Sequence, residues 1–353
     1  MDALITVLPG DGIGPEVCSE GLRVLDAVAN KYGHRFDCAE QLIGGAAIDA
    51  TDDPYPADTR AACAESDAVI LGAVGGPKWS DPNAALRPEQ GILALRADLE
   101  VFANIRPVRI LDSLADASPI KADRLDGVDI VVIRELTGGI YFGAKTRDKD
   151  SASDLCIYQR HEVERIIRVA ARLAGERRGK LCSVDKANVL ETSRFWRDIA
   201  VRTMAEEFPD IELEHLLVDA AAMHLINRPA AFDVMVTENM FGDILTDEAS
   251  MLAGSMGMLP SASLGESSRG LYEPIHGSAP DIAGRGIANP CGMIASIAMM
   301  LRLSFELEEE AAAIEAAIER TIENGIRTAD ISGAGHSQAS TAEMADAIIQ
   351  QLQ

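Results

Sequence analysis

Short runs of apolar residues alternate along this chain with longer segments in which apolar residues recur every three or four positions. The short runs are typical of buried strands, and the longer segments are typical of amphipathic helices. We expect strands at 3–8, 67–74, 128–135, 180–184, 213–219 and 232–237. We expect helices from about 15 onward, around 89–102, 163–173 and 193–207, and directly after 237. This alternation predicts an α/β protein with a largely parallel sheet.

Two regions depart from the alternation. Strand-like runs are denser between 106 and 160, where the segment RELTGGIYFG, 134–143, predicts strand segments around a Gly-Gly turn. We expect a second, smaller domain or an arm in this region. After Pro290 the pattern predicts helices, and the last pair is rich in Ala and Glu. At 353 residues the chain is long enough for two domains of ordinary size.

Composition and charge exclude several classes of partner and site. With 56 acidic and 32 basic residues the net charge is −24, so the surface repels nucleic-acid phosphates and anionic lipid. No apolar run approaches the roughly 20 residues of a membrane helix. The N-terminus predicts a first strand in place of a signal peptide, so we expect a cytoplasmic protein. Six scattered cysteines without a C-x-x-C pair argue against a zinc site and against a disulfide framework.

A glycine-rich turn near the N-terminus resembles a dinucleotide fingerprint only superficially. The segment LPGDGIGPEV, 8–17, follows a strand and opens a helix. Counting G-x-G-x-x-G from Gly10 finds Gly12 but places Pro15 at the third glycine. Asp11 would also carry a negative charge beside the pyrophosphate. The match is weak, and a Rossmann dinucleotide site is not supported.

Two aspartates lie between apolar stretches in FGDILTDEAS, 241–250. Asp243 and Asp247 are one helical turn apart, and a buried carboxylate needs a cap, a partner or a metal ion. These residues alone leave two interpretations open: Asp243 caps the helix and Asp247 faces solvent, or both bind a cation. Asp219 follows an apolar strand and is either an N-cap or a third carboxylate. Ligands that are all oxygen suit Mg²⁺ or Mn²⁺ rather than zinc.

Several basic residues lie on a predicted helix or at the ends of predicted strands, where they could bind an anionic ligand. One helix face combines an acid, two aliphatic residues and a guanidinium, at Glu89, Ile92, Leu93 and Arg96. Arg106 follows that helix, and Arg134 ends a buried strand. Each arginine alone could form a structural ion pair, but three of them beside unexplained aspartates favour a polycarboxylate ligand. Lys186 also follows a strand, where ligands bind in α/β sheets, although a solvated lysine is the alternative.

The segment LYEPIHGSAPDIAGRGIANP, 271–290, is a long loop of small residues. Such residues let the backbone approach a ligand closely, and long loops without regular structure are usually functional. His276 and Asn289 lie in it, and Asp281 offers a bidentate acceptor for a ribose diol. A plain surface loop is the alternative.

Taken together, five segments resemble the β-decarboxylating dehydrogenases, the isocitrate–isopropylmalate dehydrogenase family. They are LPGDGIGPEV, RELTGGIYFG, DKANVLETSRFW, FGDILTDEAS and HGSAPDIAG with IANP, and the resemblance covers essentially the whole chain. It implies an isopropylmalate dehydrogenase-like two-domain α/β fold with a dimerisation arm in the middle domain. It also implies a cofactor-side domain of 1–101 and 253–353, a substrate and dimerisation domain of 102–252, and a homodimer with shared active sites.

The resemblance further implies a substrate site. Arg96, Arg106 and Arg134 would bind the malate carboxylates, and Glu89, Val189 and Asp219 would also contact the substrate. An isocitrate enzyme needs polar groups for a third carboxylate, whereas Ile92 and Leu93 suit an isopropyl group. The implied reaction is the NAD-dependent oxidative decarboxylation of 3-isopropylmalate to 4-methyl-2-oxopentanoate and CO₂ in leucine biosynthesis. Glu89 would either serve the nicotinamide amide or exclude anionic substituents.

Metal and proton-transfer roles follow from the same resemblance. Asp243 and Asp247, with Asp219 from the partner chain, would hold Mg²⁺ or Mn²⁺ on the hydroxyl and carboxylate oxygens of the substrate. Lys186, also from the partner, would help to deprotonate the hydroxyl as hydride leaves for NAD. Tyr141 would supply a proton to the enolate that remains after CO₂ is lost.

The cofactor implied by the resemblance is NAD. The segment HGSAPDIAG has Asp281 followed by Ile282. A carboxylate at position 281 would accept a hydrogen bond from the ribose 2′-hydroxyl of NAD and would repel the 2′-phosphate of NADP. The expected cofactor contacts are Ile13, Gly76, Glu89, His276, Gly277, Ser278, Ala279, Pro280, Asp281, Ile282, Ala283, Gly284, Asn289 and Asp330.

Two alternatives remain at this stage. A tartrate or alkylmalate dehydrogenase of the same family would share the whole metal site. A catalytically silent, metal-binding regulatory subunit is a rival of another class, against which intact Tyr141, Lys186 and the three aspartates argue.

Overall fold

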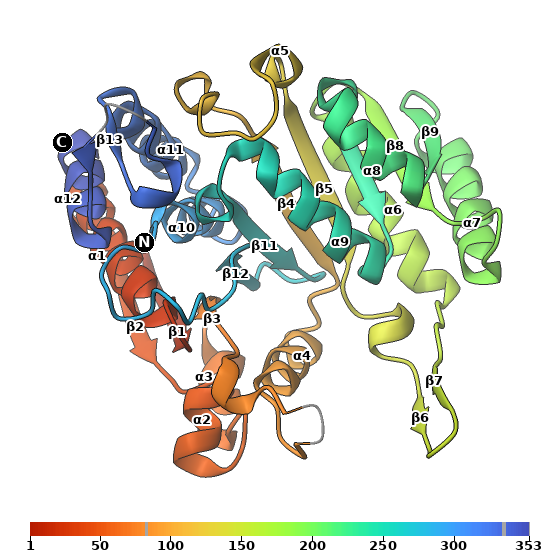
Figure 1. Ribbon diagram of the computed structural model, residues 1–353, viewed down its shortest axis with the longest axis horizontal. Coiled ribbons are helices and arrows are strands. Elements are labelled where there is room, and N and C mark those ends of the chain that lie inside the picture. Colours follow the sequence, from red (N-terminus) through yellow and green to blue (C-terminus); the bar gives the residue numbers. More distant parts are fainter. Residues whose placement is uncertain (82–83, 334–336, 353) are drawn as a thin grey trace. The chain divides into compact units, whose positions relative to one another are not determined.

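The computed structural model describes residues 1–81, 84–333 and 337–352, and the chain divides into two compact units (Figure 1). The first unit comprises Met1–Val101, Leu111–Ala117 and Ala253–Gln353, and the second comprises Phe102–Ile110 and Ser118–Leu252. Within the first unit, the buried Arg327 binds the Asp116 carboxylate at 3.0 Å and the carbonyl of Ser113. These contacts attach the short segment 111–117 to the C-terminal part of that unit.

The sheet of the first unit has the strand order β2-β1-β3-β12-β11. Its strands are β1 (Asp2–Gly10), β2 (Arg35–Glu40), β3 (Ala68–Ala73), β11 (Pro260–Leu264) and β12 (Gly270–Pro274). Neighbouring strands are parallel except for β11 and β12, and Val7 pairs with Ile70. Every residue of β3 is buried, which explains its uninterrupted apolar sequence. The predicted strands at 3–8 and 67–74 are confirmed.

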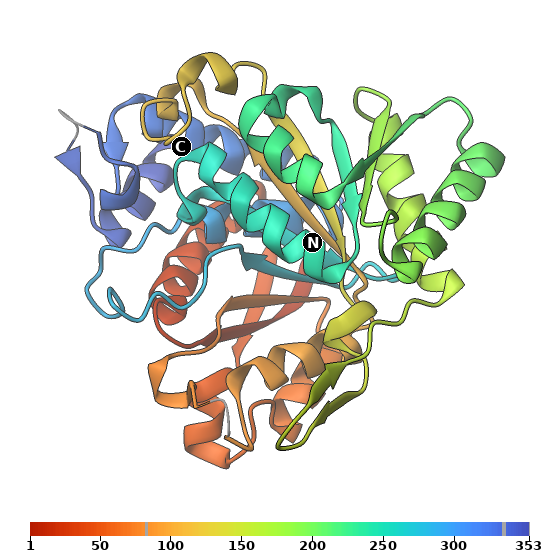
Figure 2. The same cartoon turned by 45° about the vertical axis from the view of Figure 1, so that its right-hand side comes forward.

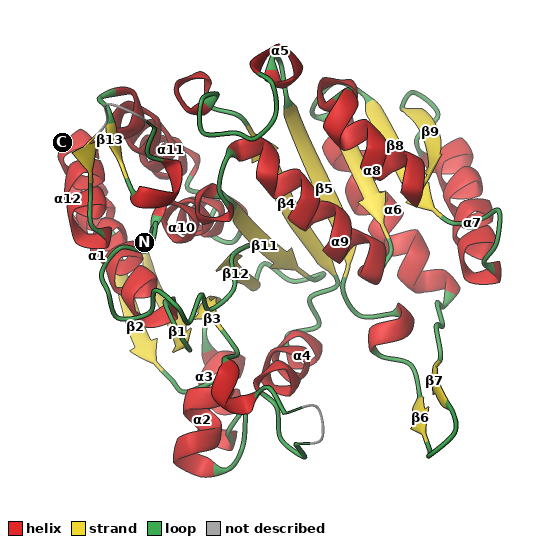
Figure 3. Ribbon diagram, in the orientation of Figure 1, coloured by secondary structure: helices red, strands yellow, loops and turns green. Residues whose placement is uncertain are grey.

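Helices cover this sheet (Figure 3). They are α1 (Gly14–Tyr32), α2 (Gly44–Thr51), α3 (Ala57–Glu65), α4 (Pro88–Asp98), α10 (Cys291–Leu303), α11 (Glu308–Glu323) and α12 (Thr341–Leu352). Leu8, Leu71 and Leu271 form one core with side chains of α3 and α4, Cys63 and Leu95 among them. The helices predicted after Pro290 are confirmed, and a short strand pair, β13 (Ile326–Arg327) with β14 (Ser337–Gln338), lies between α11 and α12.

The second unit has its own five strands in the order β4-β5-β10-β8-β9. They are β4 (Ala103–Arg109), β5 (Asp129–Glu135), β8 (Lys180–Asp185), β9 (Glu212–Leu217) and β10 (Val234–Thr237). Among the described strands of this group, β4 and β5 pair antiparallel, and the other neighbouring strands pair parallel. Mostly parallel pairing in both units confirms the predicted α/β class.

Helices lie on both faces of this second group of strands. They are α6 (Arg160–Gly175), α7 (Glu191–Glu207), α8 (Val218–Asn227) and α9 (Asn239–Ser250), while the short α5 (Ala122–Leu125) precedes β5 and lies beyond the strand ends (Figure 1). Helices α6 and α7 cover one face, with Ile166 and Trp196 in its core, while α8 and α9 lie side by side on the other (Figure 2). The described residues of the whole chain include no helix both long enough and apolar enough to cross a membrane.

Short 3₁₀ turns connect several of these elements. They lie at Pro77–Trp79, Asp112–Leu114, Gly139–Tyr141, Pro229–Ala231, Met251–Ala253, Met256–Met258 and Ala329–Ile331.

The prediction of strand segments around the Gly-Gly turn of 134–143 is wrong. Strand β5 ends at Glu135, whose buried carboxylate accepts hydrogen bonds from the backbone N–H groups of Thr137 and Gly138. The chain then forms the 3₁₀ turn at Gly139–Tyr141. A Cβ on Gly138 would lie 2.6 Å from the Tyr158 ring, so this glycine permits close packing rather than a hairpin. The hairpin follows later, between β6 (Lys145–Arg147) and β7 (Ala152–Asp154).

The acid of the N-terminal glycine-rich turn is a structural acceptor. The buried carboxylate of Asp11 accepts backbone hydrogen bonds from Gly45, Ala46 and Gly75, each at 2.8 Å. Gly12 has φ +61, and a Cβ there would lie 1.9 Å from the carbonyl oxygen of Ser278. Asp11 therefore joins the loops after β1 and β3 to the first turn of α2, at the end of the sheet where α/β proteins bind ligands.

Replacing Asp11 by Ala should destabilise the first unit. Its carboxylate satisfies three backbone donors, and leaving buried donors unpaired should lower the free energy of unfolding by about 3 kcal/mol. Urea unfolding followed by circular dichroism measures the change. The exposed Asp26 of α1 is the control, and Asp26→Ala should change stability by less than about 0.5 kcal/mol. Equal unfolding midpoints for the two variants would show that Asp11 does not hold these loops.

Candidate functional site

Arg134, at the end of β5, is the centre of a polar cluster in the second unit. Its side chain is buried, and its Nε and Nη2 donate to the Asn239 Oδ1 atom at 3.1 and 2.8 Å. Its Nη1 forms an ion pair with Asp243 on α9. Gly242 makes this possible, because a Cβ at that position would lie 2.6 Å from the Arg134 Cγ atom. The glycine thus allows α9 to approach β5 closely enough to place a carboxylate against the guanidinium.

Tyr141 joins the same cluster from the 3₁₀ turn. Its hydroxyl donates to Asp243 Oδ2 at 2.9 Å, so the carboxylate lies between a guanidinium and a phenol. Burial raises the pKa of Tyr141 to about 12, and the hydrogen bond to Asp243 and the charge of Asp243 act in the same direction. At neutral pH Tyr141 is therefore a neutral phenol that can donate a proton.

Asp247 lies one helical turn beyond Asp243 on α9. Its side chain is 59% exposed, and its Oδ1 is 3.9 Å from Nη1 of the buried Arg106. Arg106 is itself held by Asn104 and Thr246, each at 2.6 Å. Partial burial raises the pKa of Asp247, Arg106 lowers it, and the Asp243 charge raises it again. The pair Asp243 and Asp247 therefore presents carboxylate oxygens from one helix face beside two arginines.

The capping interpretation of Asp243 is wrong. The N-cap of α9 is Glu238, whose side chain accepts from the Phe241 backbone N–H at 2.7 Å. Asp243 lies within the helix and is paired with Arg134. Nor does Asp219 cap its helix, because the N-cap of α8 is Leu217.

Lys186 and Asp219 form a second polar pair, at the ends of β8 and β9. Lys186 Nζ lies 2.5 Å from Asp219 Oδ1, and this hydrogen bond lowers the pKa of the aspartate. Val189, in the same loop as Lys186, is 61% exposed. Asp219 does not join the other two aspartates, since the described residues contain no group of three or more His, Cys, Asp or Glu side chains able to hold a metal ion.

Helix α4 of the first unit carries four of the predicted residues. Glu89 is exposed, Ile92 and Leu93 are half-buried, and Arg96 is buried. Arg96 forms an ion pair at 2.9 Å with Glu273 of β12, a partner that the sequence did not suggest. Its Nε has no hydrogen-bond partner among the described residues.

The loop after β12 lies against the glycine-rich turn within the first unit. The backbone N–H of Ile13 donates to the Ser278 carbonyl at 2.9 Å. Asn289 donates to Asp330 at 3.0 Å, and burial lowers the pKa of His276. Asp281 is exposed. Ile13 and Ser278 are thus in contact, as are Asn289 and Asp330.

The other predicted cofactor residues surround these contacts. Gly277, Ala279, Pro280, Ile282, Ala283 and Gly284 belong to the same loop, and Gly76 follows the glycine that Asp11 holds.

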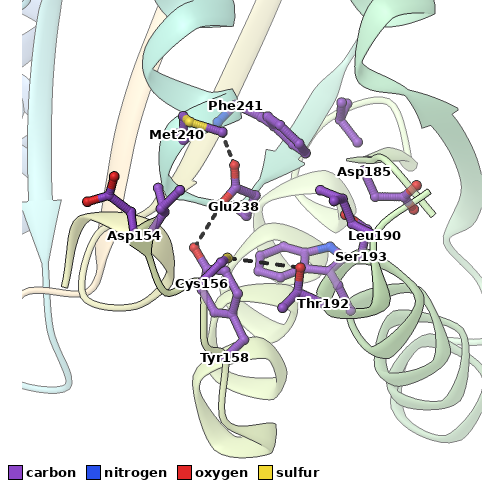
Figure 4. A pocket seen from close by; sticks show the side chains of 13 residues that line it. Asp154, Cys156, Tyr158, Asp185, Leu190, Thr192, Ser193, Glu238, Met240 and Phe241 are labelled. Atoms are coloured by element: carbon purple, nitrogen blue, oxygen red, sulfur yellow. Dashed lines mark hydrogen bonds between the residues drawn. The ribbon is translucent and has the colours of Figure 1, made fainter. Parts of the chain in front are cut away.

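The sequence did not predict the buried polar residues Asn239, Glu238 and Tyr158, which are connected to Arg134 by hydrogen bonds. Asn239 and Glu238 directly follow β10, and Tyr158 reaches both of them from the start of α6. Beside them lies a mainly apolar cavity of about 320 Å³ whose lining includes Cys156, Trp196 and Met240 (Figure 4). Polar residues directly after a fully buried strand were the available signal.

Replacing Asp243 by Asn should lower the pKa of Tyr141 from about 12 toward its ordinary value of 10.0, because the hydrogen bond to the carboxylate and its charge both raise it. An NMR titration of labelled tyrosine Cζ resonances, assigned with Tyr141→Phe, measures this. Asp247→Asn is the control and should leave the Tyr141 pKa nearly unchanged. An unshifted resonance in Asp243→Asn would show that Asp243 does not act on the phenol.

Comparison with known proteins gives this geometry a family context. The family described as isocitrate/isopropylmalate dehydrogenase matches residues 4–348. A 3-isopropylmalate dehydrogenase of Anaeromyxobacter dehalogenans is 59% identical over 100% of both chains, and one of Bacillus subtilis is 54% identical over 99% of this chain and 98% of its own. Isocitrate dehydrogenase of Methylococcus capsulatus superposes with a TM-score of 0.87 at 35% identity, covering 99% of each chain. This chain belongs to the isocitrate/isopropylmalate dehydrogenase family.

Proposed function

We propose that this protein catalyses the NAD- and Mg²⁺- or Mn²⁺-dependent oxidative decarboxylation of 3-isopropylmalate to 4-methyl-2-oxopentanoate and CO₂. The reaction would be a step of leucine biosynthesis in the cytoplasm. One observation carries the proposal: Arg134, Asp243 and Tyr141 meet at one point in a chain that relatives named for this reaction match over its whole length. Such a reaction needs a cation to bind a carboxylate, an oxygen ligand for a metal ion and a proton donor. Arg134, Asp243 and Tyr141 would supply these groups in that order.

Substrate binding in this proposal rests on arginines and on aliphatic side chains. Arg96, Arg106 and Arg134 are buried guanidinium groups, and each would contribute positive charge toward the malate carboxylates. Ile92 and Leu93 on α4 are half-buried aliphatic residues, whereas a substrate with a third carboxylate would need polar groups at these positions. An isopropyl substituent is therefore favoured.

The aspartates of α9 fit a divalent metal ion of the Mg²⁺ or Mn²⁺ type. Asp243 and Asp247 offer hard oxygen donors one helical turn apart, and the 59% exposure of the Asp247 side chain leaves it accessible to a cation. Asp219 would be the third carboxylate, supplied by the partner chain. When bound, the metal supplies stabilisation of negative charge on the substrate oxygens.

The proton transfers are assigned to Lys186 and Tyr141. Lys186 lies 2.5 Å from Asp219 and would help to deprotonate the substrate hydroxyl, in its neutral form as the proton acceptor. Tyr141, neutral at physiological pH, would donate a proton to the carbon that loses CO₂. Both groups lie beside carboxylates that orient them, as an acid and a base must be oriented before they can act.

NAD is the proposed hydride acceptor, bound by the loop after β12. The exposed Asp281 would accept hydrogen bonds from the ribose 2′-hydroxyl and repel a 2′-phosphate. His276, kept neutral by burial, and Asn289, held by Asp330, would line the same site with Ile13 and the backbone of Ser278.

A homodimer with shared active sites completes the proposal. Helices α8 and α9 expose large apolar side chains, with Met223 at 69%, Ile226 at 52% and Ile244 at 59%. An exposed apolar surface of this kind favours association. Asp219 and Lys186 are paired with each other and apart from the other two aspartates, so the metal site would be completed across a two-fold axis.

Turnover of the purified protein tests the proposal. With Mg²⁺ or Mn²⁺, 3-isopropylmalate should be converted far faster than isocitrate, malate or tartrate, NAD should be preferred to NADP, and EDTA should abolish activity. Asp247→Asn should lower kcat by about 100-fold or more, because it removes a metal ligand. Asp198→Asn, at an exposed site on α7, is the matched control and should keep full activity.

Two outcomes would contradict the proposal. Faster turnover of tartrate or another alkylmalate would assign a different substrate within the family. No turnover of any of these acids, despite a folded protein, would favour the silent regulatory subunit.

A further inference from the structure

We infer that Asn239 is a positioning residue for substrate binding: its uncharged amide fixes one edge of the Arg134 guanidinium without adding a second negative charge to that of Asp243, so the cluster still attracts a substrate carboxylate. The inference rests on the proposed function, because it concerns the carboxylate that Arg134 would bind there. It adds to that function a residue that none of the expected roles includes.

The contacts of Asn239 fix the orientation of its amide. The Oδ1 atom accepts from both Nε and Nη2 of Arg134, at 3.1 and 2.8 Å. The Nδ2 atom donates to the Gly138 carbonyl at 3.3 Å, and the backbone N–H donates to the Tyr158 hydroxyl at 3.0 Å. Rotating the amide by half a turn would place NH₂ against the guanidinium and oxygen against a carbonyl. Only one orientation therefore satisfies all these groups.

The carboxylate next to Asn239 in sequence is directed elsewhere. Glu238 accepts from the Phe241 backbone N–H at 2.7 Å and from the Tyr158 hydroxyl at 3.3 Å (Figure 4). At the start of α9, the carboxylate of Glu238 is therefore directed at the helix N-terminus and at the Tyr158 hydroxyl. The neutral amide of Asn239 is directed at Arg134. Glu238 is 8% exposed and Asn239 is 1% exposed. Solvent therefore does little to screen the negative charge that distinguishes the carboxylate from the amide.

A charged acceptor in place of the amide would act against the substrate. An aspartate would keep oxygen acceptors for Nε and Nη2 and would form a bidentate ion pair with Arg134. Its negative charge would add to that of Asp243, which already pairs with Nη1. A carboxylate of the substrate would then lie near two carboxylates of the protein. Because the site is buried, the repulsion between these negative charges would be only weakly screened.

The test compares Asn239→Asp with Asn239→Ser. The first keeps the acceptors and adds charge, whereas the second removes the paired contact without adding charge. Calorimetric titration with 3-isopropylmalate and Mg²⁺, without NAD, gives Kd, and steady-state kinetics give kcat and both KM values. We expect Asn239→Asp to raise Kd and KM for 3-isopropylmalate by about 10–100-fold, the usual range for a charge-assisted contact, with KM for NAD nearly unchanged. Asn239→Ser should raise them by about 3–10-fold, because it removes neutral hydrogen bonds to Arg134 without adding charge.

Tyr158→Phe is the matched control for a purely structural effect. It removes a buried hydroxyl that binds the Asn239 backbone and Glu238 but leaves the Arg134 contact in place. It should lower the melting temperature with little change in Kd. Size-exclusion chromatography and melting curves establish that each variant is folded.

Each outcome decides the inference. Kd values for Asn239→Asp equal to wild type, or losses in Asn239→Ser as large as those in Asn239→Asp, would overturn it. If Asn239→Asp does not fold, Asn239→Ser decides, and wild-type Kd in that variant would overturn the inference. A wild-type protein that neither binds nor converts 3-isopropylmalate would instead show that the proposed function has failed.

Discussion

The second unit is organised around one buried positive charge. A guanidinium without partners in the protein interior costs about 3–5 kcal/mol or more, so the surroundings of Arg134 must supply acceptors. They do so from α9, which begins directly after β10 and whose Gly242 lets it lie close to β5. Asn239 and Asp243 occupy successive turns of that helix and reach the same side chain. The packing of β5 against α9 and the chemistry of the site thus depend on the same contacts.

This arrangement prepares the groups before any ligand binds. Asp243 is shared between Arg134 and Tyr141, so the phenol is already oriented and its pKa already raised. Asp247 and Arg106 repeat the pairing one turn later at a longer distance of 3.9 Å. Preorganised charges cost little reorganisation during a reaction, which is where such a cluster contributes most to rate.

Sequence reasoning succeeded where a pattern has a single physical cause. Continuous apolar runs such as β3 predicted buried parallel strands, whereas the two aspartates at helical spacing left a cap and a cation site equally open. It failed at RELTGGIYFG, because glycine there serves close packing against Tyr158, and a distant contact leaves no local signal. The Glu273 partner of Arg96 and the Asn239 partner of Arg134 were missed for the same reason, since they are 177 and 105 residues away in sequence.

In the proposed dimer, each active site would combine Asp243 of one chain with Lys186 of the other. Mixing Lys186→Ala and Asp243→Asn homodimers, each inactive, and unfolding and refolding them together tests it directly. Random pairing gives roughly half mixed dimers, in which one site collects both lesions and the other is intact. Recovery of about a quarter of wild-type activity is the predicted result. A mixture that stays inactive would contradict the account, because a site built from one chain always carries a lesion.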